Sequence, residues 1–394
     1  MSLLRLAWAY ARRRPLSTLL VVIMLALGVA TVALTLLVKH ELEARLTRDA
    51  AGIDLVVGAK GSPLQIVLAG VYHADVPPGN IPLSAIDTLR RNPLVAQVIP
   101  LALGDSFNGP RIVGTEPGLV ALYGGTLEKG KLWSLPMDAV LGSEVARTSR
   151  LRVDDRFVGS HGLAEGGGPH ADARYTVTGV LAPTGTVLDR LVLTSLASVW
   201  RVHEHDHDAD AVAQREVTLA LVKYRTPLAA ASLPRAIDRE TALVAASPAF
   251  ETARLLTVFG AGVGLIRAFA WLLVAASTLM LFIALAQTLD ERRYDLAIMR
   301  ALGASRGQVA TVLLSESLLL AAAGTLLGLA IAHVAMAATG WWLPQAGPLS
   351  AAARHFLPEE WGVVGVAFAA GIIAALWPAW RAYRLDVAAT LAEG

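Results

Sequence analysis

The chain has 394 residues, of which 55% are hydrophobic and only 17% are charged. Soluble domains carry about a quarter charged residues, so this composition excludes an ordinary soluble domain. The formal net charge of +2 gives no reason to expect a nucleic-acid partner. Because the sequence contains no cysteine, no disulfide stabilises any part of it.

The apolar residues are concentrated in four runs that polar segments separate. A helix rises about 1.5 Å per residue and needs about 20 apolar residues to cross a bilayer. Each run reaches that length, and buried helices of soluble proteins rarely continue so far without a charge. The runs therefore predict transmembrane helices at residues 16–38, 266–289, 307–339 and 361–380.

Residues 1–15 are expected to form an amphipathic helix on the cytoplasmic membrane face, where their basic side chains would contact lipid head groups. A simple basic flank of the first span is the alternative. The first apolar run is longer than the hydrophobic region of a signal peptide, and charged residues rather than small ones follow Val38. We therefore expect this run to stay as a membrane anchor.

Residues 39–265 separate the first two spans and alternate between strand-like and helix-like stretches. Strands are expected at 53–57, 111–114, 139–142, 175–180, 190–193 and 217–222. Helices are expected at 84–91, 143–149, 196–202 and 228–239, a helical stalk at 248–267, and polar loops at 159–172 and 203–210. The predicted fold class is an α-helical membrane protein with four transmembrane helices and an α+β extracytoplasmic domain, of one or two lobes, inserted between the first and the second.

The basic residues indicate the orientation of the spans. They cluster in Arg12–Arg14, in residues 290–306 and at Arg381 and Arg384. The positive-inside rule places these three segments in the cytoplasm. Both termini, including the tail 381–394, are then cytoplasmic, and residues 39–265 and the short loop 340–360 are periplasmic. The expected location is the cell inner membrane.

The polar loop His203-Glu204-His205-Asp206-His207 carries imidazoles at alternate positions. This pattern can chelate zinc, so His203, His205 and His207 are candidate metal ligands, which His161 and His170 of the other loop can join. A hydrophilic loop without metal is the alternative. The same residues satisfy the H-E-x-x-H pattern of zinc proteases, but the polar middle positions and the missing third ligand argue against that chemistry.

A P-loop-like stretch at residues 125–131 is incomplete, because Leu132 stands where that motif requires Ser or Thr. The predicted topology also places it outside the cell membrane, away from cytoplasmic ATP. We therefore expect no nucleotide to be bound by this chain.

Residues 290–306, DERRYDLAIMRALGASR, lie between the second and third spans. On a helix, the apolar residues fall on one side: Leu296, Met299 and Leu302, with Ile298 beside them. Gly303 is expected to end this helix, and Glu316 is expected at the inner interface of the third span. Such a short charged element is suited to being gripped by a soluble partner that pulls on both spans; an ordinary amphipathic connector is the alternative.

The stretch ERRYDLAIMRALGASRGQV resembles the signature of FtsX/MacB/LolC-type permeases of ABC transporters, E-R-R-x-E-I-x-I-L-R-A-L-G-A-S, with Asp295 in place of the second Glu. Residues 315–318 and 377–386 are similar to the family's third-span start and closing motif, although Val387 replaces a Pro. Residues 128–146 and 175–185 are similar to motifs of its external domain. The resemblance covers nearly the whole chain.

This resemblance implies a MacB-like external domain and a separate cytoplasmic ABC ATPase dimer that carries ATP and magnesium. It also implies a second permease copy, either a homodimer partner or a paralogous permease, and a periplasmic or lipoprotein partner. ATPase closure would move the stalks and reshape the external domains, a mechanism called mechanotransmission. The residues implied to contact the ATPase are Glu291, Arg292, Arg293, Leu296, Ile298, Met299, Arg300, Ala301, Leu302 and Gly303.

The expected function is that of a non-enzymatic permease subunit that couples ATP hydrolysis to export or extraction of a substrate in the periplasm, with a link to zinc handling. One alternative is an FtsX-like complex that regulates a periplasmic partner such as a cell-wall hydrolase. Another is a membrane-anchored zinc metallohydrolase that uses His203, Glu204 and His207. The sequence leaves the substrate open, and also the choice between homodimer and heterodimer.

Overall fold

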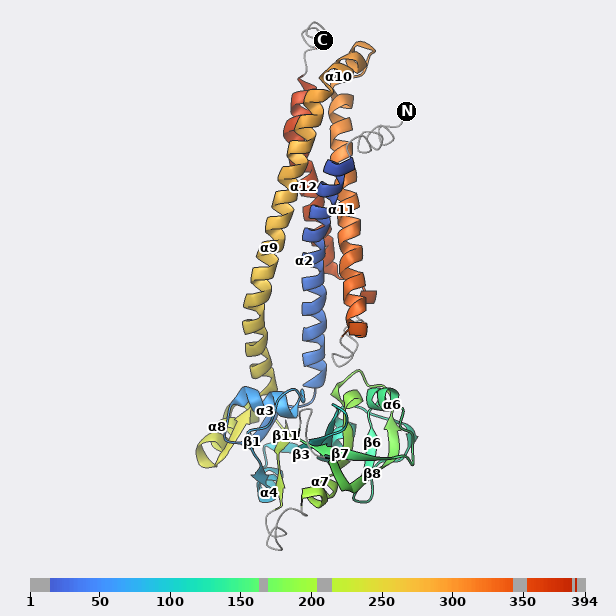
Figure 1. Ribbon diagram of the computed structural model, residues 1–394. Coiled ribbons are helices and arrows are strands. Elements are labelled where there is room, and N and C mark those ends of the chain that lie inside the picture. Colours follow the sequence, from blue (N-terminus) through green and yellow to red (C-terminus); the bar gives the residue numbers. More distant parts are fainter. Residues whose placement is uncertain (1–14, 163–168, 204–214, 343–352, 385–386, 388–394) are drawn as a thin grey trace. The chain divides into compact units, whose positions relative to one another are not determined.

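The computed structural model describes residues 15–162, 169–203, 215–342, 353–384 and 387. The chain divides into two compact units. Residues 44–257 form the α+β unit, and the segments before and after them form the helical unit. Figure 1 shows the α+β unit as a sheet with short helices and the helical unit as long helices that run along one another.

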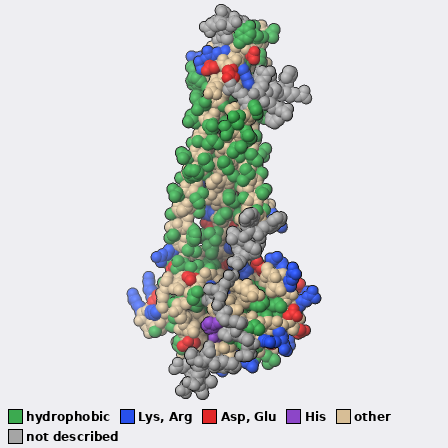
Figure 2. Space-filling view, in the orientation of Figure 1, with side chains coloured by type: hydrophobic (Ala, Val, Ile, Leu, Met, Phe, Trp, Pro, Cys, Tyr) green, Lys and Arg blue, Asp and Glu red, His purple; other side chains and the backbone are tan. Residues whose placement is uncertain are grey.

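Among the described residues, four helices are long and apolar enough to cross a membrane. They are α2 (Pro15–Asp49), α9 (Pro248–Glu291), α11 (Arg306–Trp342) and α12 (Pro358–Tyr383). A short helix, α10 (Arg293–Ala301), connects α9 to α11. Hydrophobic side chains cover the visible face of the long helices, and charged side chains gather at the end that carries α10 (Figure 2). The four predicted transmembrane helices are therefore confirmed, and each helix extends beyond its apolar run.

Small residues let α2 and α11 approach closely. Gly324 and Gly328 lie one turn apart on α11 and face α2. A Cβ on Gly324 would lie 2.9 Å from the side chain of Leu25, and one on Gly328 would lie 2.6 Å from the carbonyl oxygen of Ala26. Membrane helices gain packing energy from such small-xxx-small contacts because lipid supplies no hydrophobic drive between helices.

The α+β unit is built on one ten-stranded sheet with the order β12-β1-β11-β3-β4-β9-β6-β8-β5, in which β7 also pairs with β3 and β8. A separate two-stranded sheet joins β10 to β2. The strands are β1 (Leu55–Ala59), β2 (Ile81–Pro82), β3 (Val95–Ser106), β4 (Arg111–Thr115), β5 (Leu127–Gly130), β6 (Asp138–Leu141), β7 (Arg156–His161), β8 (Pro169–Leu181), β9 (Val192–Ser195), β10 (Glu216–Val217), β11 (Leu219–Tyr224) and β12 (Leu243–Ala246).

Short helices cover the sheet, and the unit has two hydrophobic clusters. The helices are α3 (Pro63–Gly70), α4 (Leu83–Arg91), α5 (Gly118–Leu122), α6 (Ser143–Ser149), the 3-10 helix η1 (Val187–Arg190), α7 (Leu196–His203) and α8 (Ala229–Glu240). One cluster includes Leu55, Ile86 and Val222. The other includes Ile112 and Tyr175. The sequence left open whether this domain has one lobe or two, and the structure shows two hydrophobic clusters on one continuous sheet.

The α+β fold class is confirmed, and the four expected helices of this unit are present with no end shifted by more than one residue. The expected loop at 159–172 is wrong at both ends, because Gly159–His161 belong to β7 and Pro169–Asp172 belong to β8. These polar residues form strands because β7 and β8 pair with each other in the sheet. The twelve-residue strand β3 was not expected, since Pro100 and Gly104 interrupt its pattern.

Candidate functional site

The turn that leaves α10 is held by a specific backbone arrangement. Gly303 has a φ of 103°, in the left-handed region. The Ala304 amide donates to the carbonyl oxygen of Met299 at 3.0 Å, and the Gly303 amide donates to that of Arg300 at 3.1 Å. This hydrogen-bond pair is a Schellman motif, which ends a helix and favours glycine at the left-handed position. The structure thus confirms that Gly303 ends α10.

The start of α11 is capped by its own side chains. The Ser305 amide donates to Gln308 Oε1 at 2.7 Å, and the Gln308 amide donates to Ser305 Oγ at 3.2 Å. This reciprocal pair is a capping box, which satisfies two helix-end amides at once. Together with the Schellman motif, it gives the turn between α10 and α11 a defined geometry.

One face of α10 packs into the helical unit. Leu296 and Ala297 are buried. Leu296 belongs to a cluster that joins all three neighbouring long helices at this end; its other members are Leu289 of α9, Val309 and Leu313 of α11, and Ala382 of α12. Met299 packs against the same cluster. The short helix is therefore attached to the spans on both sides of it.

The opposite face of α10 is exposed and partly apolar. Tyr294 is 48% exposed, Ile298 is 37% exposed and Leu302 is 83% exposed. The expectation that Leu296, Met299 and Leu302 share one side is therefore wrong in part. The reason is that Leu302 follows the last residue of α10, where the chain already turns toward Gly303. We call Tyr294, Ile298 and Leu302 the outer row.

Ion pairs tie residues 290–306, which we call the elbow, to the adjacent helices. Asp290 Oδ1 lies 2.7 Å from Arg293 Nη2 and 3.3 Å from Arg381 Nη1 of α12. Arg292 Nη1 lies 3.7 Å from Glu316 Oε2 of α11. The Arg292 and Glu316 side chains are only 13% and 8% exposed, so their charges are screened little by solvent. Glu316, expected at the membrane interface, is thus the partner of an elbow arginine.

A hollow lies beside this buried pair. Its lining comes from α2, α9 and α11 and includes Thr18, Thr288, Arg292 and Glu316. The free space there is about 350 Å³ when its open mouth is included. The hollow combines polar hydroxyls with the charged pair at the end of the helical unit that carries α10.

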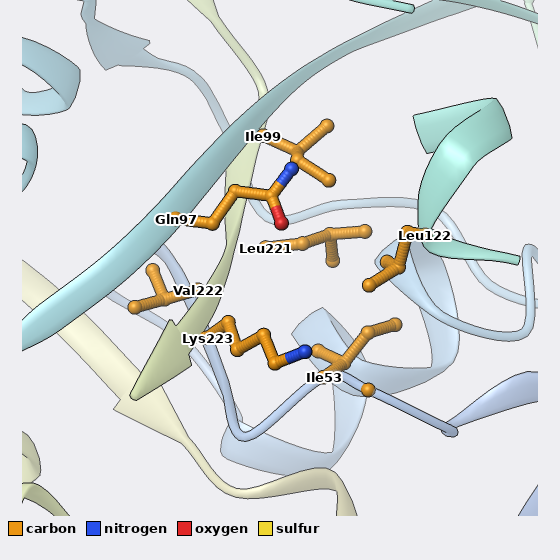
Figure 3. A pocket seen from close by; sticks show the side chains of 8 residues that line it. Ile53, Gln97, Ile99, Leu122, Leu221, Val222 and Lys223 are labelled. Carbon is orange, nitrogen blue, oxygen red and sulfur yellow. The ribbon is translucent and has the colours of Figure 1, made fainter. Parts of the chain in front are cut away.

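The α+β unit also has a hollow, lined by β3, β11 and the segment before β1 (Figure 3). The Lys223 side chain reaches toward Ile53, and Leu122 of α5 also lines the hollow. Its space of about 160 Å³, including the mouth, is below the roughly 300–1,000 Å³ of ligand pockets. We assign no ligand to it. In the P-loop-like stretch, Leu127–Gly130 form β5 and no helix follows it directly. That this chain binds no nucleotide stays a prediction.

The predicted metal ligands are only partly described. His203 is the last residue of α7, whereas Glu204, His205 and His207 lie outside the described residues, so the H-E-x-x-H interpretation stays a prediction. His203 lies near Asp105 of β3 and His161 of β7. The side chain of His170 also lies outside the part of the chain whose side chains are described. Asp105 is a candidate that the sequence did not indicate, since it sits in an unremarkable apolar strand.

Comparison with protein families identifies both units. Residues 18–242, more than half of the chain, match the MacB-like periplasmic core domain, and residues 267–387 match the FtsX-like permease C-terminal domain. The chain belongs to the MacB/FtsX-type family of ABC transporter permeases. Permeases of this family work with cytoplasmic ABC ATPases and are generally non-catalytic transmembrane subunits. The four apolar helices and the MacB-like domain fit a multi-pass inner-membrane permease.

Two solved structures are similar to about half of this chain. The periplasmic region of MacB from Actinobacillus actinomycetemcomitans is 12% identical, with a TM-score of 0.36, and the match covers 53% of this chain and 95% of that one. The extracellular domain of the noncanonic ABC-type transporter YknZ from Gram-positive bacteria is 13% identical, with a TM-score of 0.30. That match covers 49% of this chain and 98% of the YknZ domain. No curated protein matched the sequence.

Proposed function

We propose that this permease couples ATP hydrolysis by a cytoplasmic ABC ATPase dimer to conformational work in the periplasm, through the elbow at residues 290–306. In this proposal both termini are cytoplasmic and residues 39–265 are periplasmic, in agreement with the arginines of the elbow and of the C-terminal end of α12. The permease acts with a second permease copy and performs no covalent chemistry itself.

The observation that carries this proposal is the two-sided character of α10. Its inner face is buried in the cluster around Leu296, and its outer row is exposed although it is apolar. Exposed apolar side chains beside charged ones are typical of protein contact sites. A helix that packs against the spans with one face and exposes apolar side chains on the other can bind a partner that moves the spans.

The connections on both sides of the elbow support mechanical coupling. α9 continues as one helix from Pro248 to Glu291, and the division between the two units falls within it. α11 begins at the capping box directly after the elbow. A displacement of α10 therefore acts on two helices, one of which leads into the α+β unit. We propose that this mechanotransmission drives export or extraction of a substrate.

Replacing an outer-row residue tests the proposal. Leu302→Asp and Ile298→Asp place a charge on the exposed face and leave the buried cluster intact, so we expect a normally folded permease that no longer co-purifies with its partner ABC ATPase. Leu135→Asp, at another exposed leucine of the chain, is the matched control and should keep the ATPase. Retention of the ATPase by both outer-row variants would refute the coupling site.

A further inference from the structure

Asp105, His161 and His203 come from three separate elements of the α+β unit and meet at one place. Asp105 Oδ1 lies 3.8 Å from His161 Nδ1, and Asp105 Oδ2 lies 3.6 Å from His203 Nε2. Potential ligand atoms of the three residues all lie within 4.8 Å of one another. The two imidazole rings face each other edge to face, with 5.4 Å between their centres.

The backbone holds these side chains in place. β3 and β7 pair in register so that Asp105 stands opposite His161. His203 ends α7, and the adjacent strand residue Gly104 leaves room for its ring: a Cβ on Gly104 would lie 3.2 Å from His203 Nε2. β3 has an irregular register between Leu103 and Asp105, which is where it can redirect a side chain. The convergence thus follows from sheet pairing and a helix end, which are rigid parts of the fold.

The cluster is buried on one side and open on the other. Asp105 is 1% exposed, whereas the side chains of His161 and His203 are 59% and 35% exposed. The nearby rings of Tyr175 and Phe157 are stacked, with ring centres 5.2 Å apart, and Tyr175 is close enough to feel the charge of Asp105. Burial, and then the charge of Asp105, raise the pKa of Tyr175. A carboxylate in such surroundings requires a cationic partner, because an uncompensated buried charge is costly.

We propose that Asp105, His161 and His203 form a binding site for a divalent transition-metal ion, with zinc as the preferred occupant. Two imidazoles and one carboxylate are a common zinc donor set. In a tetrahedral zinc site, with bonds of about 2.0–2.1 Å, neighbouring ligand atoms are roughly 3.3 Å apart. The observed atoms lie within 4.8 Å of one another, so side-chain shifts of roughly 1.5 Å or less would close the site. The fourth position faces the open side and takes water or a donor from another molecule.

This site differs from the one expected from the sequence. It keeps His203 and His161, does not use His205, His207 or His170, and adds Asp105, which is 98 positions before His203 in the chain. It does not depend on the coupling of the permease to an ATPase. The competing arrangement is one in which the two histidines contact Asp105 directly and bind no metal.

Zinc titration of the complete permease decides between these arrangements. The protein is purified in detergent without a polyhistidine tag, stripped with a chelator, and titrated with zinc by calorimetry, with bound zinc counted by elemental analysis. We expect one high-affinity zinc per chain. Cobalt(II) in place of zinc should give the visible absorption bands of a tetrahedral site.

His161→Ala is the decisive variant, because this exposed side chain can be removed without opening the core. We expect at least a tenfold loss of zinc affinity, as in well-ordered metal sites that lose one interaction. Asp105→Asn and His203→Ala should lose affinity similarly, and Gly104→Ala should weaken binding by displacing the His203 ring. His355→Ala, at an exposed histidine of the helical unit, should leave affinity unchanged.

A permease that binds no high-affinity zinc would overturn the proposal, and so would either of two further results. One is zinc binding by the His161→Ala variant with unchanged affinity. The other is loss of the high-affinity zinc in a His205→Ala/His207→Ala double variant while His161→Ala retains it, which would place the metal on residues 204–214. Thermal unfolding measured in chelator confirms that each variant is folded before it is titrated.

Discussion

Arg292 and Glu316 form an ion pair between the elbow and α11, with Nη1 and Oε2 separated by 3.7 Å. Both side chains are largely buried, and Arg292 stands at the junction of α9 and α10. The pair therefore links the end of one span, the proposed ATPase contact and the start of the next span. In the proposed coupling, movement of α10 would reach α11 through this pair.

We predict that Glu316→Ala destabilises the helical unit by about 3 kcal/mol, because it leaves the buried Arg292 charge without its carboxylate. Thermal unfolding in detergent measures this loss. Arg292→Met combined with Glu316→Leu should restore most of the stability, since an apolar pair replaces the charges. If the ion pair transmits movement, the assembled complex of the double variant should have a lower ATPase activity than that of the original permease, even though its stability is restored. A double variant with full activity would show that the pair serves stability alone.

At the elbow turn, we predict that Gly303→Val weakens ATPase association, because a β-branched residue strains the left-handed conformation. The cost is about 1–2 kcal/mol. Gly303→Asn is the matched variant, since asparagine tolerates this conformation, and it should behave nearly like the original permease. The measurement is co-purification of the ATPase at equal permease levels. Equal loss in both variants would mean that the side chain itself clashes with the partner.

Between α2 and α11, Gly328→Leu should lower the thermal unfolding temperature of the permease, since no side chain fits against the Ala26 carbonyl. Overpacking of this kind costs about 1–3 kcal/mol. Gly365→Leu on α12 is the control, because open space surrounds its Cβ position. If both variants unfold at the same temperature, close packing of α2 on α11 is not what stabilises the helical unit.

We predict that the His73 side chain makes the free energy of unfolding depend on pH. Although part of this residue is exposed, its Nδ1 atom is buried. Burial, and then the charges of Arg111 and Arg190, lower the pKa of His73 to about 3. In the unfolded chain the pKa of His73 is about 6.5. Between pH 6.5 and 3, His73 is therefore protonated in the unfolded chain and neutral in the folded one. Stability should thus fall in that window as the pH falls, by about 1.4 kcal/mol per pH unit.

His73→Asn removes this titration and tolerates the residue's positive φ of 51°. We expect its unfolding temperature to depend less on pH between 6.5 and 4 than that of the original permease. The comparison uses circular dichroism of the full chain in one detergent. Parallel pH curves for the two proteins would contradict the assignment to His73.

The sequence was sufficient to predict the four spans, the α+β class of the inserted domain and the elbow. A bilayer imposes a minimum apolar length and a charge bias, and both can be read from consecutive residues. Gly303 could be predicted as a helix end because the left-handed conformation selects glycine. The S-x-x-Q spacing of Ser305 and Gln308 also carries the capping box, a local signal that was present but not used.

The tertiary structure alone decided which side chains meet. Glu316 could be placed near the membrane interface from its position in an apolar run, but its pairing with Arg292 required the angle of the elbow. The division of α10 into a buried face and an outer row depended on the cluster that Leu296 joins across three helices. Asp105 could not be linked to His161 and His203 from sequence, because strand pairing and helix docking between distant segments leave no periodic signal along the chain. Local chemistry thus specified the elements, and long-range packing specified the sites.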